Sequence, residues 1–64
     1  MRSNGLRIGT KVRVQEEYSR NLYLRGWVGE IKQSYRDASY AVFEVRFSNE
    51  QTELFWPADL ETAE

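Results

Sequence analysis

The side chains available for chemistry are carboxylates, tyrosines and basic groups, because the sequence contains neither histidine nor cysteine. Without these two residue types, the usual pairs of a nucleophile and a general base cannot be assembled. A zinc site would need carboxylates alone, and no cysteine pair can form a disulfide. The composition therefore predicts a protein that is not an enzyme and that holds no metal or cofactor.

Two local patterns deserve comparison with known kinds of site. Glu50 and Glu53 form a carboxylate pair. Because charged residues are normally exposed, we interpret the pair as solvated acids that flank a hairpin turn, with metal binding as the alternative. Gly26 and Gly29 precede no predicted helix, so they do not form a phosphate-binding loop. Neither pattern adds a catalytic residue.

Aromatic and basic side chains gather in an irregular stretch at residues 16–25, and another tyrosine follows in a second polar stretch at 34–39. Tyrosine supplies a rigid anchor at protein interfaces, and a solvated loop has little need of two tyrosines and two leucines. We therefore predict a surface that binds a partner protein. Its residues are Tyr18, Arg20, Leu22, Tyr23, Arg25 and Tyr35.

Trp27 and Trp56 stand at the ends of predicted strands. Small barrels need large side chains to fill their interior, so we interpret both tryptophans as packing in the core or at its rim. Contact with a partner is the alternative.

Hydrophobic alternation predicts five short strands that position these loops. They are expected at residues 11–15, 27–33, 40–47, 52–56 and 60–62. Proline cannot donate a backbone hydrogen bond to a neighbouring strand, so Pro57 ends the fourth strand, and residues 58–60 suit a 3₁₀ turn. The first loop has room for one helical turn near residues 20–24.

Five antiparallel strands with a long first loop predict an all-β fold, a small five-stranded SH3-like barrel with a 3₁₀ turn before the last strand. Closing the sheet would remove most of its exposed edge. We expect a flexible lead-in at 1–6, the barrel at 7–62 and a tail at 63–64. The core is expected to consist of Val12, Val14, Val28, Ile31, Phe43, Val45, Phe47, Leu54 and Leu60.

Charge is nearly balanced, with a net value of −1, whereas general nucleic-acid binders are usually basic. All nine Lys and Arg lie in residues 1–46, and residues 47–64 hold five acids and no base. A basic stripe with interleaved tyrosines would suit single-stranded nucleic acid or an acidic protein, and an ordinary solvated face is the alternative. The stripe would contain Arg13, Arg20, Arg25, Lys32, Arg36 and Arg46.

No stretch approaches the about 18 apolar residues of a membrane helix. Residues 1–5 are too short and polar to form a secretory signal, so a cytoplasmic location is expected. We also expect the isolated chain to be a monomer.

Four segments resemble a known family: Ile-Gly-Thr-Lys-Val-Arg-Val at 8–14, Val-Gly-Glu-Ile-Lys at 28–32, Val-Arg-Phe-Ser-Asn at 45–49, and Leu-Phe-Trp-Pro-Ala-Asp-Leu-Glu at 54–61. They are similar to small SH3-like subunits of cyanobacterial and algal photosynthetic electron transport, above all to the PetP family of the cytochrome b6f complex. The resemblance implies a non-catalytic peripheral subunit that regulates or stabilises this complex. It would sit at the thylakoid membrane without inserting into it.

Two other classes stay open. A nucleic-acid-binding module of the SH3-like, KOW type is one. The other is an enzyme similar to type II dihydrofolate reductases, which end in a comparable aromatic-proline step. Their active pore requires Val-Gln-Ile-Tyr, whereas residues 53–56 here are Glu-Leu-Phe-Trp. The glutamine and tyrosine that would contact cofactor and substrate are absent, which disfavours the enzyme.

Overall fold

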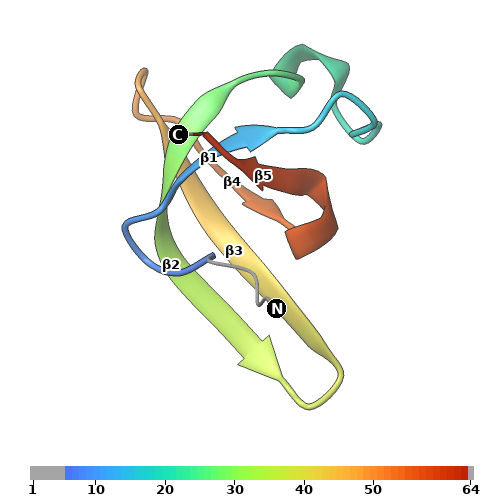
Figure 1. The fold of residues 1–64 in the computed structure, drawn as a ribbon, viewed down its shortest axis with the longest axis vertical. Coiled ribbons are helices and arrows are strands. Elements are labelled where there is room, and N and C mark those ends of the chain that lie inside the picture. The colour runs from blue at the N-terminus through green and yellow to red at the C-terminus, as the bar shows by residue number, and fades with distance from the viewer. Residues whose placement is uncertain (1–5, 64) are drawn as a thin grey trace.

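A computed structural model describes residues 6–63 and gives a five-stranded antiparallel sheet in the order β4-β3-β2-β1-β5. The described residues contain two 3₁₀ turns and no α-helix, so the predicted all-β class is confirmed. The strands are β1 (Lys11–Val14), β2 (Val28–Asp37), β3 (Tyr40–Phe47), β4 (Thr52–Phe55) and β5 (Leu60–Thr62) (Figure 1). The 3₁₀ turns are η1 (Leu22–Leu24) and η2 (Pro57–Asp59).

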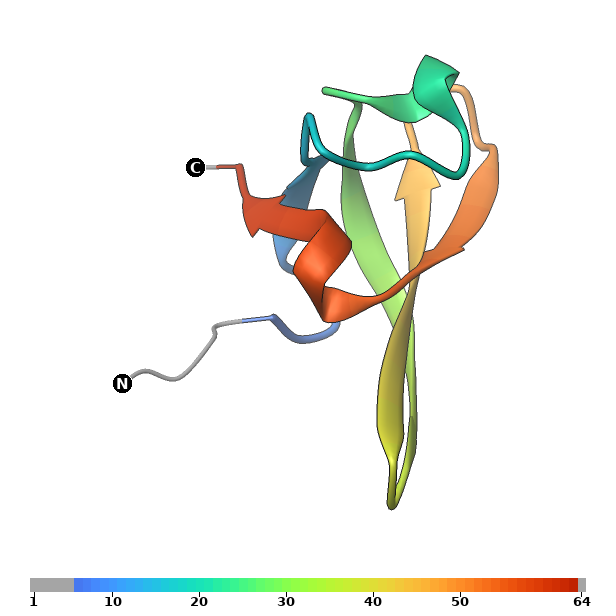
Figure 2. The same ribbon diagram turned by 90° about the vertical axis from the view of Figure 1, so that its right-hand side faces the viewer.

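The expected closure of the sheet is wrong. β4 and β5 lie at opposite ends of the strand order, and they do not pair with each other. β5 pairs only with β1, and the chain leaves the sheet after Phe55 to form η2. Figure 2 shows the first loop passing over the gap between β5 and β4. β4 and β5 are therefore not joined by a hydrogen-bonded ladder, and the edge of β4 away from β3 pairs with no strand of the described residues.

The second predicted loop, at residues 34–39, is mostly strand. β2 continues to Asp37, and a two-residue turn at Ala38 and Ser39 leads into β3. Tyr35 pairs with Val42 and Asp37 with Tyr40 across the hairpin. The hairpin projects beyond the rest of the sheet (Figure 2). Both of its faces meet solvent there, so these strand residues are polar and lack the alternation on which the sequence prediction depended.

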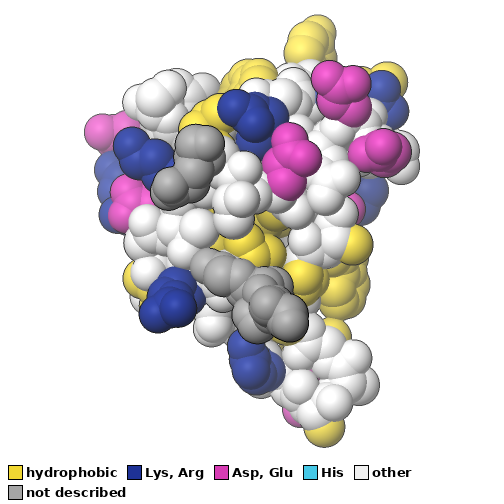
Figure 3. Space-filling view, viewed as in Figure 1, with side chains coloured by type: hydrophobic (Ala, Val, Ile, Leu, Met, Phe, Trp, Pro, Cys, Tyr) yellow, Lys and Arg dark blue, Asp and Glu magenta, His cyan; other side chains and the backbone are white. Residues whose placement is uncertain are grey.

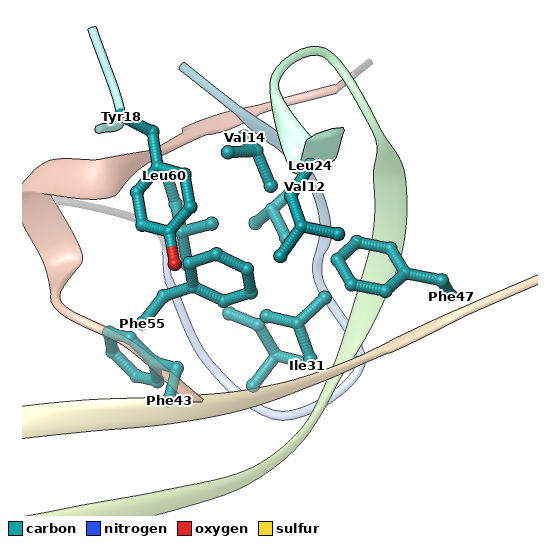
Figure 4. Close-up of a cluster of buried hydrophobic side chains, with 10 residues drawn as sticks. Val12, Val14, Tyr18, Leu24, Ile31, Phe43, Phe47, Phe55 and Leu60 are labelled. Atoms are coloured by element: carbon teal, nitrogen blue, oxygen red, sulfur yellow. The ribbon is translucent and has the colours of Figure 1, made fainter. Parts of the chain in front are cut away.

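The core contains seven of the nine residues predicted for it (Figure 4). Strand alternation accounts for them, since β3 turns Phe43, Val45 and Phe47 to one face as expected. Gly29 allows the close approach of β2 to β3, because a Cβ atom there would lie 2.6 Å from the Arg46 carbonyl oxygen. The seven are Val12, Val14, Ile31, Phe43, Val45, Phe47 and Leu60.

Two residues predicted for the core are exposed instead. Leu54 pairs with Glu44 and points to the outer face with 53% of its surface exposed, while its neighbour Phe55 points inward. Val28 pairs with the exposed Arg13 and is also exposed. Phe55 therefore takes the interior position that had been assigned to Leu54, and two residues of the first loop supply the remaining core side chains.

The two tryptophans differ in their burial. Trp27 is half-buried and packs edge-on against Phe47, with ring centroids 5.1 Å apart, as predicted for a residue at the rim of the core. Trp56 is exposed and lies edge-on against Tyr40 at 6.1 Å on the outer face of the sheet. Packing against the core is therefore confirmed for Trp27 alone.

Candidate functional site

The first loop, residues 15–27, is anchored by two buried side chains. Tyr18 is 6% exposed and packs against Phe55 with ring centroids 5.2 Å apart, and Leu24 is also buried. Figure 4 shows both side chains among the strand residues of the core. The Arg25 Nε–H donates to the Tyr18 carbonyl oxygen across 2.6 Å. The backbone on both sides of η1 is thus held against the sheet.

A second link joins the first loop to η2. The Arg20 Nη2 lies 3.0 Å from the Asp59 Oδ2, and its guanidinium lies 5.3 Å from the centre of the Tyr18 ring. The same Asp59 oxygen accepts a hydrogen bond from the Trp56 backbone N–H at 3.1 Å. One carboxylate therefore stabilises the start of η2 and also fixes the loop.

The tip of the first loop presents two apolar side chains to solvent. The Asn21 side-chain oxygen accepts a hydrogen bond from the Tyr23 backbone N–H at 3.1 Å and so caps η1. This turn directs Leu24 into the core and leaves Leu22 60% and Tyr23 86% exposed. Arg20, Asn21, Leu22 and Tyr23 line a shallow hollow there. The helical turn considered from the sequence near residues 20–24 is present as η1.

Tyr18 is corrected from an exposed contact residue to a core residue, because its ring fills space beside Phe55. Irregular loops have no periodicity that distinguishes a tyrosine facing inward from one facing outward. No signal in the sequence separates Tyr18 from Tyr23 in this respect.

A groove lies between the first loop and β4, and we call it the β4 groove. Its volume is about 650 Å³. It brings together three predicted site residues, Tyr18, Arg20 and Tyr35, whereas Leu22, Tyr23 and Arg25 do not line it. The lining residues are Tyr18, Arg20, Asn21, Tyr35, Glu44, Thr52, Glu53 and Leu54.

Tyr35 is held by a carboxylate within this groove. Its hydroxyl donates to the Glu44 Oε1 at 3.2 Å. This hydrogen bond, followed by the negative charge of Glu44 and slight desolvation, raises the pKa of the Tyr35 phenol above its usual value. The phenol therefore stays a neutral hydrogen-bond donor well into the alkaline range.

Exposed apolar side chains also gather on the outer face of β2, β3 and β4. Strand pairing places Tyr35 opposite Val42 and Leu54 opposite Glu44. Tyr35 and Leu54 both line the β4 groove, and Tyr40 packs against Trp56, which follows β4; all four side chains are exposed. Sequence analysis did not assign Tyr40, Leu54 or Trp56 to the site. Residues 54–56 are apolar at every position, so the sequence carries no signal that Leu54 faces outward.

Basic side chains are distributed among acids. Figure 3 shows Lys and Arg side chains interspersed with Asp and Glu over the upper part of the face seen in that view. Four of the six residues considered for a basic stripe form ion pairs, with N···O distances from 3.0 to 3.8 Å. The arrangement resembles an ordinary solvated face. The pairs are Arg13–Glu61, Arg20–Asp59, Lys32–Glu30 and Arg46–Glu50.

No protein-family model, curated protein or solved structure matches the chain. Among residues 6–63, no helix has the length and apolar character needed to cross a membrane. The same residues contain no cluster of three or more side chains of the kinds that commonly hold a metal ion.

Proposed function

We propose that this chain is a non-catalytic protein–protein docking module with an SH3-like fold. Its strand order, its long first loop and the 3₁₀ turn between β4 and β5 support the fold assignment. The absence of histidine and cysteine from the sequence supports a binding role over catalysis.

The observation that carries the docking role is the anchored first loop with an exposed apolar tip. Leu22 and Tyr23 face solvent although Tyr18 and Leu24 hold the adjoining backbone in the core. Ordering a loop opposes association, and here the fold itself already supplies much of that order. Leu22 and Tyr23 therefore act as a preorganised contact, since tyrosine is among the residues that dominate binding energy at interfaces.

The proposed partner is a membrane-bound complex of photosynthetic electron transport, with the chain as a regulatory or stabilising peripheral subunit. The support is the similarity of segments 8–14, 28–32, 45–49 and 54–61 to PetP-type subunits of cytochrome b6f. In this role the chain is a monomer that docks from the cytoplasmic side of the thylakoid membrane.

Affinity capture from detergent-solubilised photosynthetic membranes tests this proposal. We expect the tagged protein to retain cytochrome b6f subunits, identified by mass spectrometry, and the double variant Leu22→Ser/Tyr23→Ser to lose them. Ile8→Ser is the matched control, because Ile8 is as exposed as Leu22 and lines neither the β4 groove nor the hollow at the tip of the first loop. Equal retention by all three proteins would remove the loop tip from the interface. Failure to enrich any b6f subunit would contradict the proposed partner.

A further inference from the structure

We propose that the free edge of β4 receives an extended segment of the partner protein as an added antiparallel strand, and that this segment carries lysine or arginine together with aliphatic residues. The inference rests on the proposed docking function, and it specifies which surface of the partner is recognised and how.

The direction of the backbone groups in β4 supports strand addition. The Phe47 N–H donates to the Gln51 carbonyl oxygen at 2.9 Å, which sets the phase of the β3–β4 ladder. Backbone groups alternate in direction along an antiparallel strand. Those of Glu53 and Phe55 therefore face β3, and those of Thr52 and Leu54 face away from the sheet. No strand of the described chain pairs with that side of β4.

Thr52 and Leu54, the two residues whose backbone groups face away from β3, are exposed and line the β4 groove. Thr52 and Leu54 line the groove on one side, and Arg20 and Asn21 of the first loop line it on the other. Neighbouring strands lie about 4.8 Å apart, so an added strand would occupy the groove beside β4. Unpaired edges of this kind are sites where extended peptides bind through main-chain hydrogen bonds.

The charges of the groove define the partner. Glu44 accepts a hydrogen bond from the Tyr35 hydroxyl, and Glu53 accepts one from the Gln51 side-chain amide at 3.3 Å. Neither carboxylate forms an ion pair with Lys or Arg among the described residues. The single cation of the lining, Arg20, is already paired with Asp59. The groove thus offers uncompensated negative charge, which favours a basic segment and disfavours nucleic acid.

The apolar surface of the groove is the reason why the segment should also carry aliphatic residues. Leu54 is 53% exposed on the same face as Tyr35. Side chains directly opposite each other in an antiparallel pair lie in contact, so the residue facing Leu54 would be aliphatic. An incoming strand that alternates the two kinds of residue would place its aliphatic side chains on the face of Leu54 and its basic side chains on the face of Glu53, whereas Glu44 shares the face of Leu54.

An NMR titration with synthetic peptides tests the inference. The probe is an acetylated and amidated nonapeptide that alternates lysine and valine, and its control has glutamate in place of lysine. We expect the lysine peptide alone to bind, and to slow hydrogen exchange of the Thr52 and Leu54 amides by about tenfold or more. The Glu53 and Phe55 amides already face β3, so their exchange should change much less.

Two further comparisons isolate the main-chain hydrogen bonds. Leu54→Pro removes an outward N–H at an edge position where proline is tolerated, and Leu54→Ala removes the side chain alone. We expect Leu54→Pro to bind the lysine peptide about three- to tenfold more weakly than Leu54→Ala does. Peptides N-methylated at one of two adjacent central residues test the same bond on unaltered protein. Only the peptide whose methyl group faces β4 should lose affinity.

The inference would be overturned if the lysine peptide did not bind, or if the glutamate control bound equally well. Equal affinity of both N-methylated peptides would also contradict it. So would slow exchange of the Thr52 and Leu54 amides in the absence of peptide, since self-association would then account for the protection. Membrane capture separates this failure from that of the proposed function. Loss of b6f subunits from Leu22→Ser/Tyr23→Ser with full retention by Leu54→Pro would leave docking intact and refute strand addition.

Discussion

Arg20 and Asp59 are 39 residues apart in sequence, yet the Arg20 Nη2 lies 3.0 Å from the Asp59 Oδ2. The contact joins the first loop to the turn that precedes β5. Because Arg20 is about half exposed, solvent screens the ion pair, and its effect on stability is small. Its main consequence is positional, since it fixes the first loop beside the β4 groove.

The two partners of this ion pair should differ in their effect on stability. We expect Arg20→Gln to lower the free energy of unfolding by less than about 1 kcal/mol. Asp59→Ala should cost more, about 1–2 kcal/mol, because the hydrogen bond from the Trp56 N–H is lost as well. Urea unfolding of both variants and of the double variant measures the difference. Equal costs would show that the bond to Trp56 contributes nothing.

The same substitution should cost much more stability at Tyr18 than at Tyr23, although both belong to the first loop. Tyr18→Leu leaves a gap beside Phe55 and should lower the free energy of unfolding by about 1–3 kcal/mol. Tyr23→Leu is the matched control, and since Tyr23 is largely exposed we expect a change within about 0.5 kcal/mol. Thermal and urea unfolding provide the comparison. A larger cost at Tyr23 than at Tyr18 would contradict the placement of both rings.

Substitution of Gly29 should disturb the β2–β3 ladder. An added Cβ would meet the Arg46 carbonyl oxygen at 2.6 Å and the Val45 Cγ1 at 2.7 Å, so one strand must shift. We expect Gly29→Ala to cost about 1–3 kcal/mol, as overpacking does elsewhere. Gly9→Ala is a useful comparison, because its Cβ meets no atom within 4 Å and only its positive φ opposes the change. Circular dichroism during urea unfolding measures both, and an unchanged midpoint for Gly29→Ala would refute the close approach.

The hydrogen bond between Tyr35 and Glu44 predicts a pH effect with a defined sign. The fold favours the neutral phenol, so the folded pKa is raised above the usual value of about 10. The stabilisation is therefore complete below the unfolded pKa, and it disappears as the pH rises through the folded pKa. Glu44→Gln should lower the pKa of Tyr35. NMR titration of the Tyr35 ring measures it, and the same pKa in both proteins would exclude Glu44 as the cause.

Sequence patterns predicted the strands well where one face is buried. In β3 the alternation of large apolar and polar residues identified the inward Phe43, Val45 and Phe47. The run Leu54-Phe55-Trp56 is apolar at every position, so a period of two has no phase there. Only the pairing of Leu54 with Glu44 decides which residue faces the core.

The site was harder to predict because tertiary contacts define it. Tyr18 and Tyr23 belong to one irregular loop, and the space beside Phe55 determines which of them is buried. The β4 groove likewise depends on residues distant in sequence, such as Arg20 and Leu54. Loop composition identified the tyrosines and arginines as candidates, but it could not indicate which of them lie together.

The hairpin formed by β2 and β3 has a consequence for how this domain can vary. Its outer part is held by strand pairing and by the contact of Tyr40 with Trp56, and the turn at Ala38 and Ser39 is two residues long. Residues added at the turn in even numbers can pair one to one and keep a two-residue turn, whereas an odd number leaves one unmatched. Each added pair lengthens the arm by about 3.4 Å. The length of the β2–β3 hairpin can therefore change in steps of one residue pair while the packed core stays the same.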